Sequence, residues 1–248
     1  MVLMPTPDAV LTATGLLAEG GGQKPGLGDL VVIDLGGATT DVHSVVRSGQ
    51  RAGYVQDVLA STTAQRTVEA DLGLRWNATG ILDAAGTELT SWNATSGLHS
   101  AAERRAADPH LVAETPGEMR DDVDLARLAI QIAIRRHAGR LTIELSPSGA
   151  TLRKSGRDLR TVSTVVLSGG IFRHAGEELL TQLVPRQTED DGLLLPQHHT
   201  VALDRAYLLA AGGLLATRDR QAAFALVNQE LMYLSDAPKE GSECSGSN

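Results

Sequence analysis

The residues with the clearest capacity for chemistry stand together at positions 34–41, where the sequence reads Asp-Leu-Gly-Gly-Ala-Thr-Thr-Asp. Gly36 and Gly37 carry no Cβ, so a ligand can approach their backbone closely. Exposed N–H groups on consecutive residues can form a nest that binds an anion. Thr39 and Thr40 follow and add hydroxyl donors. This composition predicts a small phosphate-binding loop.

Asp34 stands directly before this loop, at the end of the apolar run 30–33. A carboxylate beside a phosphate is unfavourable unless a cation lies between them or the carboxylate orients a water. We therefore expect Asp34 to position Mg²⁺ or an attacking water, which makes it the candidate catalytic and metal-binding residue. A plain hairpin with a tight loop is the alternative interpretation, and composition alone does not separate the two.

A second apolar run ends in paired glycines at residues 165–172, which read Val-Val-Leu-Ser-Gly-Gly-Ile-Phe. Gly169 and Gly170 permit a close backbone approach that larger residues would block. This turn is a second candidate ligand site. An ordinary turn from a strand into a helix is the alternative.

Hydrophobic periodicity predicts the elements that must position these loops. The β-branched run at 29–34 and the apolar run at 161–167 are typical of buried strands, and the alternation at 41–46 predicts another strand. The first glycine loop is then the tip of a β-hairpin. Helices are predicted at 6–18 and at 122–137, and the second of these is apolar on more than one face, which indicates deep burial.

The second half of the chain predicts one more hairpin and a helix with an unusual interior. The Ser-Pro-Ser-Gly sequence at 146–149 is a turn signal between strands at 141–145 and 150–153. A helix is predicted at 202–216. Its internal Gly212-Gly213 pair lowers helix stability unless another element packs closely there.

Composition sets the limits on partners and compartment. The chain has 248 residues, of which 42% are hydrophobic, enough for a buried core of one domain or one and a half. Its net charge of -8 and its 3% aromatic content argue against broad binding of nucleic acid or anionic membrane. Cys244 is the single cysteine, which fits a reducing cytoplasm. We expect a cytoplasmic protein with no membrane and no nucleic-acid partner.

Residues 34–41 closely resemble the second phosphate-binding motif of the actin, sugar-kinase and heat-shock-chaperone ATPase superfamily, and residues 165–172 resemble its adenosine motif. Within this superfamily the chain is similar to the MutL-type accessory proteins of adenosylcobalamin-dependent glutamate mutase, from about residue 5 to about residue 216. The supporting segments, besides the two motifs, are Pro5-Thr6-Pro7, Gly28-Asp29-Leu30, residues 66–75, Arg136-His137-Ala138-Gly139 and Gly156-Arg157-Asp158-Leu159.

The resemblance implies an α/β fold, an actin-like ATPase lobe of the ribonuclease H-like type with a mixed central sheet and flanking helices. The expected lobe covers residues 1–235, and the polar, small-residue composition of residues 236–248 predicts a disordered tail. The implied function is that of an ATP-binding accessory protein. It would reactivate an adenosylcobalamin-dependent mutase or aminomutase, whose subunits would be its partners, and it could also form a homo-oligomer.

The resemblance also implies a set of site residues, with ATP or ADP and Mg²⁺ as cofactors. Backbone N–H groups of the first glycine loop would bind the phosphates, and the hydroxyls of its two threonines would donate further hydrogen bonds. Asp34 would position Mg²⁺ or the attacking water. The second glycine turn would allow the adenosine to lie against the backbone. An acidic residue before a helix would add a further contact. In addition to Asp34, the implied residues are Gly36, Gly37, Ala38, Thr39, Thr40, Glu69, Gly169, Gly170 and Ile171.

The sequence departs from the family in one respect. Family members carry an earlier phosphate motif with Asp-x-Gly-Ser, and none precedes Asp34 here. We therefore expect this chain to be a C-terminal half, with ATP hydrolysis dependent on the other lobe. Two alternative functions remain open: a non-catalytic protein-interaction scaffold and a relative of small-molecule kinases.

Several other polar residues admit two interpretations. Glu69 and Asp71 could approach a nucleotide or could stabilise a helix N-terminus. For Arg75 we favour an ion pair with Asp71 over a phosphate contact. His43 is expected to be a partly buried structural residue. His174 follows the second glycine turn and could stack on a base or lie on the surface.

Overall fold

The computed structural model of the chain describes residues 4–47, 55–56, 63–86, 96–146, 149–180, 183–185 and 192–234. The strands are β1 (Gly20–Gly21), β2 (Lys24–Pro25), β3 (Leu30–Leu35), β4 (Thr40–Val45), β5 (Val55–Gln56), β6 (Ala64–Glu69), β7 (Arg140–Ser146), β8 (Gly149–Ser155), β9 (Thr164–Ser168), β10 (Thr200–Asp204) and β11 (Met232–Tyr233). The helices are α1 (Thr6–Glu19), α2 (Ala78–Ala85), α3 (Ser96–Ala107), α4 (Pro116–His137), α5 (Glu177–Leu180), α6 (Leu208–Ala216), α7 (Arg220–Glu230) and the 3-10 turn η2 (Gly170–Arg173).

A mixed six-stranded sheet forms the centre of the molecule, in the order β11-β10-β9-β3-β4-β6. Its central strands β10, β9 and β3 are parallel, whereas β4, β6 and β11 pair antiparallel with their neighbours. The predicted α/β class with a mixed central sheet is confirmed. The parallel trio explains why strands β3 and β9 read as continuous apolar runs, since both of their faces are buried.

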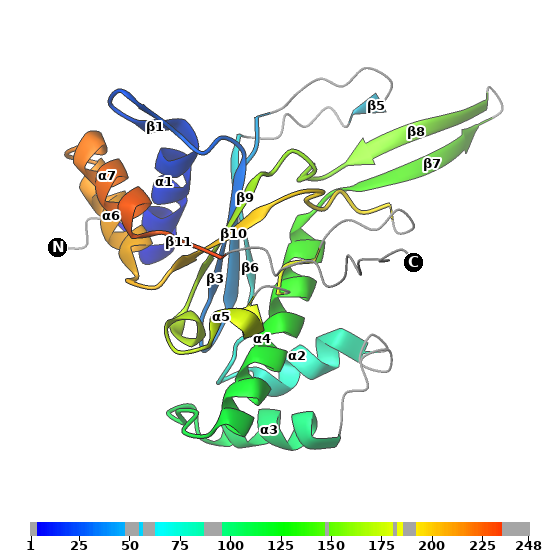
Figure 1. The fold of residues 1–248 in the computed structure, drawn as a ribbon. Helices are drawn as coiled ribbons and strands as arrows, with labels where there is room; N and C mark the ends of the chain where they lie inside the picture. The colour runs from blue at the N-terminus through cyan, green and yellow to red at the C-terminus, as the bar shows by residue number, and fades with distance from the viewer. Residues whose placement is uncertain are drawn as a thin grey trace, which may run out of the picture.

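Helices cover both faces of this sheet (Figure 1). Leu30 and Val32 point toward the face where α1, α6 and α7 pack, while Val31 and Ile33 belong to the core on the α4 side. This alternation follows from the two-residue period of a strand. Helix α4 is buried along much of its length, as its sequence predicted, and a capping box between Thr115 and Glu118 starts it.

The Gly212-Gly213 pair marks a close helix crossing. A Cβ added to Gly213 would lie 1.8 Å from the carbonyl oxygen of Ala9, so only glycine lets α6 approach the α1 backbone. The expectation that another element packs closely against this pair is confirmed. This crossing holds α1 and α6 together on one face of the sheet.

The predicted helix at 202–216 is wrong in its first part. Thr200–Asp204 forms strand β10, which pairs in parallel register with β9, and the helix begins at Leu208. The apolar run at 201–203 is too short for its period to separate a strand from a helix, and the sheet decides. The helix predicted at 122–137 also extends back to Pro116.

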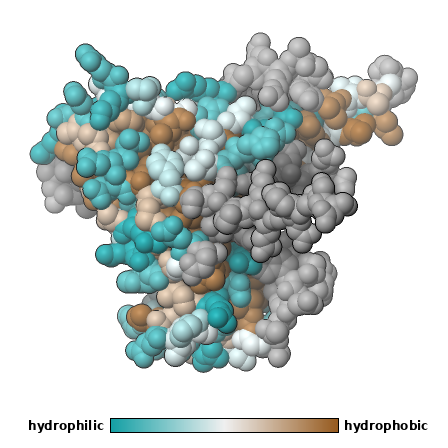
Figure 2. All heavy atoms as spheres, in the orientation of Figure 1, coloured by the Kyte–Doolittle hydropathy of each residue, from teal (hydrophilic) through white to brown (hydrophobic). Residues whose placement is uncertain are grey.

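The second predicted hairpin is confirmed and forms an arm, β7–β8, which projects from the body with β5 paired to β8 (Figure 1). One face of the arm is apolar, because Leu145 opposes Ala150 and Ile143 opposes Leu152. Ile143 and Leu145 are 69% and 84% exposed, and the arm is correspondingly brown in Figure 2. None of the described helices has both the length and the apolar character needed to cross a bilayer. The predicted tail at 236–248 lies outside the described residues.

Candidate functional site

Three carboxylates line up across one end of the sheet. In the strand register, Asp34 stands opposite Asp41 on β4 and opposite Ser168 on β9, and Ser168 in turn stands opposite Asp204 on β10. Residues that face each other across neighbouring strands share one face of the sheet. The row therefore brings together residues that are up to 170 positions apart in the chain (204 - 34).

Two of these carboxylates have partners in the protein. Arg66 contacts Asp41 through Nε at 2.8 Å and Nη2 at 2.7 Å. Asp204 is buried, and its carboxylate accepts hydrogen bonds from the Ser168 hydroxyl and from the backbone amides of Leu208 and Leu209 at the start of α6. These bonds satisfy Asp204 and fix the position of helix α6.

Asp34 differs from both. Among the described residues, its carboxylate has no hydrogen-bond or ion-pair partner. Burial raises the pKa of Asp34, and the neighbouring charges of Asp41 and Asp204 raise it further. A half-buried carboxylate beside two others gains from a bound cation, because the cation offsets both the lost hydration and the repulsion. In the part of the chain that the structure describes, no three or more His, Cys, Asp or Glu side chains lie close enough together to hold a metal ion by themselves.

The first glycine loop is the tip of the β3–β4 hairpin, as predicted, and its carbonyls are held by a neighbouring loop. The amide of Leu74 donates to the Gly36 carbonyl, and the amides of Arg75 and Trp76 donate to the Gly37 carbonyl at 2.8 and 2.9 Å. The amide of Gly36 closes the hairpin by donating a hydrogen bond to the backbone carbonyl of Thr39. The carbonyl groups of the tip are therefore bound from within the protein.

The backbone of Ala38 is held by the same neighbouring loop. The side-chain amide of Asn77 donates to the Ala38 carbonyl, and a Cβ added to Gly73 would lie 2.3 Å from that carbonyl carbon. Within the described residues, the amides of Gly37 and Ala38 donate to no protein acceptor. Two successive amides at an exposed turn, on a backbone anchored through its carbonyls, have the properties of an anion-binding nest.

The two threonines of the loop have different surroundings. The Thr39 hydroxyl donates to Asp41 at 3.2 Å and is partly exposed. Thr40 is buried, and its hydroxyl donates to the Leu72 carbonyl at 2.5 Å. Thr40 thus anchors the hairpin to the neighbouring loop, whereas Thr39 lies beside the acidic row.

The second glycine turn lies against the first hairpin. Gly169 has φ of +140°, and a Cβ there would be 2.3 Å from the Leu35 carbonyl oxygen. A Cβ on Gly170 would be 3.1 Å from the hydroxyl of Tyr207. Tyr207 itself has φ of +55°, which is rare for a bulky residue, and the Arg173 guanidinium lies 5.4 Å from its ring centre. The structure therefore brings both predicted glycine sites to the same end of the sheet.

A pocket of about 410 Å³ opens next to the second turn. Gly170, Ile171 and His174 line it together with the segment 109–113 between α3 and α4. Arg75 and Asp122 complete the wall with Met119 and are joined by a bidentate ion pair at 3.0 Å in both contacts. The pocket combines apolar and charged lining, as small-molecule sites do.

The expected pair between Arg75 and Asp71 is wrong. Asp71 instead binds Arg136 in α4 at 2.8 Å, and Arg136 also contacts Glu69 at 2.7 Å. The i, i+4 rule fails because helix α2 begins only at Ala78, so these residues lie in a turn. Glu69, at the end of β6 opposite Thr40, is thus tied to α4, which connects the edge of the hairpin sheet to that helix.

Two histidines lie deep in the structure. His43 is fully buried, and among the described residues neither of its ring nitrogens has a hydrogen-bond partner. His137 contacts the hydroxyls of Thr67 and Ser44. Burial is the main cause that lowers the pKa of each to about 4. The expectation of a structural His43 is confirmed, with deeper burial than predicted.

Sequence reasoning missed Asp204, Tyr207 and the partnership of Arg75 with Asp122. Asp204 has the same signal as Asp34, an acidic residue at the end of an apolar run, but the helix interpretation of 202–216 concealed it. Tyr207 has no sequence signal, because its left-handed conformation depends on the turn between β10 and α6. Asp122 lies 47 residues from Arg75, beyond any local pairing rule.

The fold and site define an α/β protein in which two glycine turns and a row of carboxylates meet at one end of a mixed sheet. The family model described as MutL protein matches residues 1–231. The chain is similar to the protein named Protein MutL from Clostridium tetanomorphum, with 38% identity over 222 residues. This chain belongs to the MutL protein family. The match covers 87% of this chain and 48% of the relative, so the chain spans about half the length of the relative.

Proposed function

We propose that this chain is an ATP- or ADP-binding lobe of the actin-like ATPase type, with Mg²⁺ as its cation. One observation carries this proposal: the amides of Gly37 and Ala38 at the hairpin tip and the carboxylate of Asp34, near the end of the adjoining strand β3, have no protein partners among the described residues. Mg²⁺ is commonly bound through one or two carboxylates plus substrate phosphates, and this arrangement provides the protein half of such a site.

The roles of individual groups follow from their surroundings. The amides of Gly37 and Ala38 bind phosphate oxygens, Gly36 gives the turn its shape, and the Thr39 hydroxyl assists from beside the acidic row. Bound Mg²⁺ would offset the phosphate charge next to Asp34. Asp34 holds this cation or orients the attacking water. Thr40 acts indirectly by anchoring the hairpin to Leu72.

The pocket beside Gly170 and Ile171 is suited to the nucleoside. Its volume of about 410 Å³ lies in the range of small-molecule sites. Gly169 allows this turn to lie against the Leu35 carbonyl, so the phosphate and nucleoside regions are adjacent. Glu69 forms an ion pair with Arg136. It would therefore contribute to nucleotide binding indirectly, by fixing the position of strand β6.

The resemblance to accessory proteins of adenosylcobalamin-dependent glutamate mutase supports the cellular role that we propose. In this role, nucleotide binding and slow hydrolysis drive reactivation of a mutase or aminomutase. The described residues would supply one face of the nucleotide site, namely the phosphate hairpin and the pocket beside Gly170. Turnover would also require groups that contact the nucleotide from the opposite side.

A second candidate function is a non-catalytic interaction module, and the projecting arm favours it. Ile143 and Leu145 expose most of their surface on the same face of β7. Neighbouring exposed apolar side chains are typical of protein–protein contact surfaces. In this function the ATPase fold serves only as a scaffold, so the absence of nucleotide binding would favour it.

Isothermal titration calorimetry with ATP and Mg²⁺ tests the proposal. We expect the wild-type chain to bind and an Asp34→Ala variant to lose at least about tenfold in affinity, as is usual when a metal site loses a supporting group. Asp124→Ala is the matched control, because Asp124 is a partly exposed carboxylate of α4 outside the acidic row. Absence of heat in all three proteins would refute nucleotide binding by this chain.

A further inference from the structure

Arg75 contacts both regions of the candidate site. Its backbone amide donates to the Gly37 carbonyl at 2.8 Å, and a Cβ on Gly37 would lie 3.5 Å from the Arg75 stem. Its Nε donates to the Leu111 carbonyl at 3.1 Å, in the segment 109–113 that lines the pocket. One residue thus holds the phosphate hairpin through its main chain and the pocket wall through its side chain.

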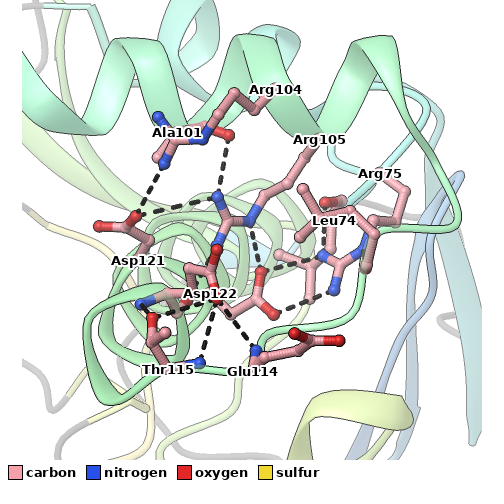
Figure 3. A network of polar contacts seen from close by, with 11 residues as sticks. Leu74, Arg75, Ala101, Arg104, Arg105, Glu114, Thr115, Asp121 and Asp122 are labelled. Carbon is pink, nitrogen blue, oxygen red and sulfur yellow. Dashed lines mark hydrogen bonds and ion pairs between the residues drawn. The ribbon is translucent and has the colours of Figure 1, made fainter.

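The guanidinium of Arg75 is fixed by a buried network (Figure 3). Both of its terminal nitrogens contact Asp122, and Arg105, which is fully buried, binds the same carboxylate through Nε at 2.5 Å. Arg105 is fixed in turn by the carbonyls of Ala101 and Glu118. A planar bidentate pair resists rotation, so displacement of Asp122 or of the pocket wall is passed to the backbone of Arg75.

The segment 109–113 forms one wall of the pocket. It has no regular secondary structure and connects α3 to α4. Among the described residues, the hydrogen bonds that hold it besides the Arg75 contact run from the amides of His110 and Leu111 to Asp108. A ligand in the pocket touches this segment and Arg75 together.

We propose that Arg75 is a positioning residue that couples occupation of the pocket to the conformation of the phosphate-binding hairpin. This inference rests on the proposed nucleotide site. A nucleoside in the pocket fixes Arg75 and the segment 109–113, and the bond from Arg75 to the Gly37 carbonyl then holds the amides of Gly37 and Ala38 in their binding orientation. Because such coupling is reciprocal, phosphate at the hairpin favours the nucleoside by the same factor.

The test replaces ATP by two probes, inorganic tripolyphosphate for the phosphate hairpin and adenosine for the pocket. The affinity of inorganic tripolyphosphate with Mg²⁺ is measured by calorimetry in the absence and presence of saturating adenosine. In the wild-type chain we expect adenosine to raise this affinity by about 5- to 150-fold, the usual range for coupled sites. In Arg75→Ala tripolyphosphate alone should still bind, because the backbone amide of residue 75 keeps its bond to the Gly37 carbonyl. Adenosine should bind more weakly, because the Arg75 side chain lines the pocket, so its concentration is raised until the variant is saturated. Under these conditions we expect a coupling factor near one, because the side-chain bond to the pocket wall is lost.

The variants are chosen so that loss of folding does not imitate loss of coupling. Arg75→Ala leaves Asp122 paired with Arg105, so no carboxylate becomes unpaired in the core. Arg75→Lys keeps the charge without the bidentate fork and is expected to retain only part of the coupling. Arg104→Ala is the control, since Arg104 forms an exposed pair with Asp121 between the same two helices.

Each outcome decides the inference. Equal coupling factors in wild-type and Arg75→Ala would overturn it, as would a wild-type factor near one although both probes bind. These outcomes leave the proposed nucleotide site intact. If neither probe binds the wild-type chain, the proposed function fails and the inference fails with it. Loss of coupling in the Arg104→Ala control would show that the effect is not specific to Arg75 and would also contradict it.

Discussion

Removal of the Asp122 carboxylate should destabilise the protein far more than removal of its sequence neighbour. Asp122 is 3% exposed and receives bonds from two arginines, one of which, Arg105, has no exposed surface. In Asp122→Ala the buried Arg105 loses its 2.5 Å contact to Asp122 and keeps only a 3.9 Å contact to the partly exposed Asp121. Breaking a buried ion pair in this way costs about 3–5 kcal/mol, because the desolvation of the remaining charge is no longer offset.

The adjacent Asp121 provides a matched comparison. Its contact to the buried Arg105 is long, at 3.9 Å, and its shorter contact, at 3.4 Å, is to Arg104, whose side chain is 52% exposed. Exposed pairs of this kind contribute about 0–1 kcal/mol. For a chain of this size, about 1 kcal/mol corresponds to roughly 2–4 °C in the melting midpoint. We therefore expect Asp122→Ala to lower the midpoint by roughly 6–20 °C and Asp121→Ala by less than about 4 °C.

Urea titration followed by circular dichroism, together with thermal melts, measures both variants. A double variant, Arg105→Met with Asp122→Leu, should be more stable than Asp122→Ala alone, since it removes the buried charge together with its partner. The reasoning would be refuted if Asp122→Ala and Asp121→Ala shifted the midpoint equally. It would also be refuted if the double variant were no more stable than the single one.

Two further predictions concern pH and packing. His43 and His137 have a pKa near 4 in the folded state and 6.5 in the unfolded state, so the unfolded state binds more protons between these values. The free energy of unfolding that their neutral forms contribute is therefore fully present above about pH 6.5. It falls by about 3 kcal/mol per histidine as the pH is lowered toward 4. His43→Leu should flatten this slope in denaturant titrations without loss at pH 7, and an unchanged slope would contradict the burial argument. Gly169→Ala should lower the melting midpoint and weaken ATP binding, because its Cβ would overlap the Leu35 carbonyl. Gly15→Ala, where a Cβ meets nothing within 4 Å in helix α1, should instead stabilise by up to about 1 kcal/mol, and a similar loss in both variants would count against a specific clash.

The elements that could be predicted from the sequence are those determined by residues close together in the chain. The apolar strand, two glycines and second strand at 29–46 form the hairpin as expected, because strand propensity and turn chemistry agree there. The glycine pair of α6 was recognised as a close-packing position for a similar reason: its cost in a helix interior calls for a compensating contact.

The features that sequence reasoning missed depend on contacts distant along the chain. Strand β10 was assigned to a helix because its short apolar run becomes a strand only when β9 pairs with it. Arg75 was assigned to Asp71 by local spacing, whereas the folded chain brings Asp122 to it. The acidic row likewise exists only through the register of four strands, so the environment of Asp34 could not be read from its neighbours in sequence.

The most direct test of the central claim is the dependence of ATP affinity on Mg²⁺, measured by equilibrium dialysis for the wild-type chain and for Asp34→Asn. The asparagine keeps the size of the side chain and removes its charge. We expect Mg²⁺ to raise the ATP affinity of the wild-type chain at least about tenfold, equivalent to about 1.4 kcal/mol, and to have little effect on the ATP affinity of the variant. An equal effect of Mg²⁺ on both proteins, or no ATP binding by either, would contradict the role assigned to Asp34 and the phosphate hairpin.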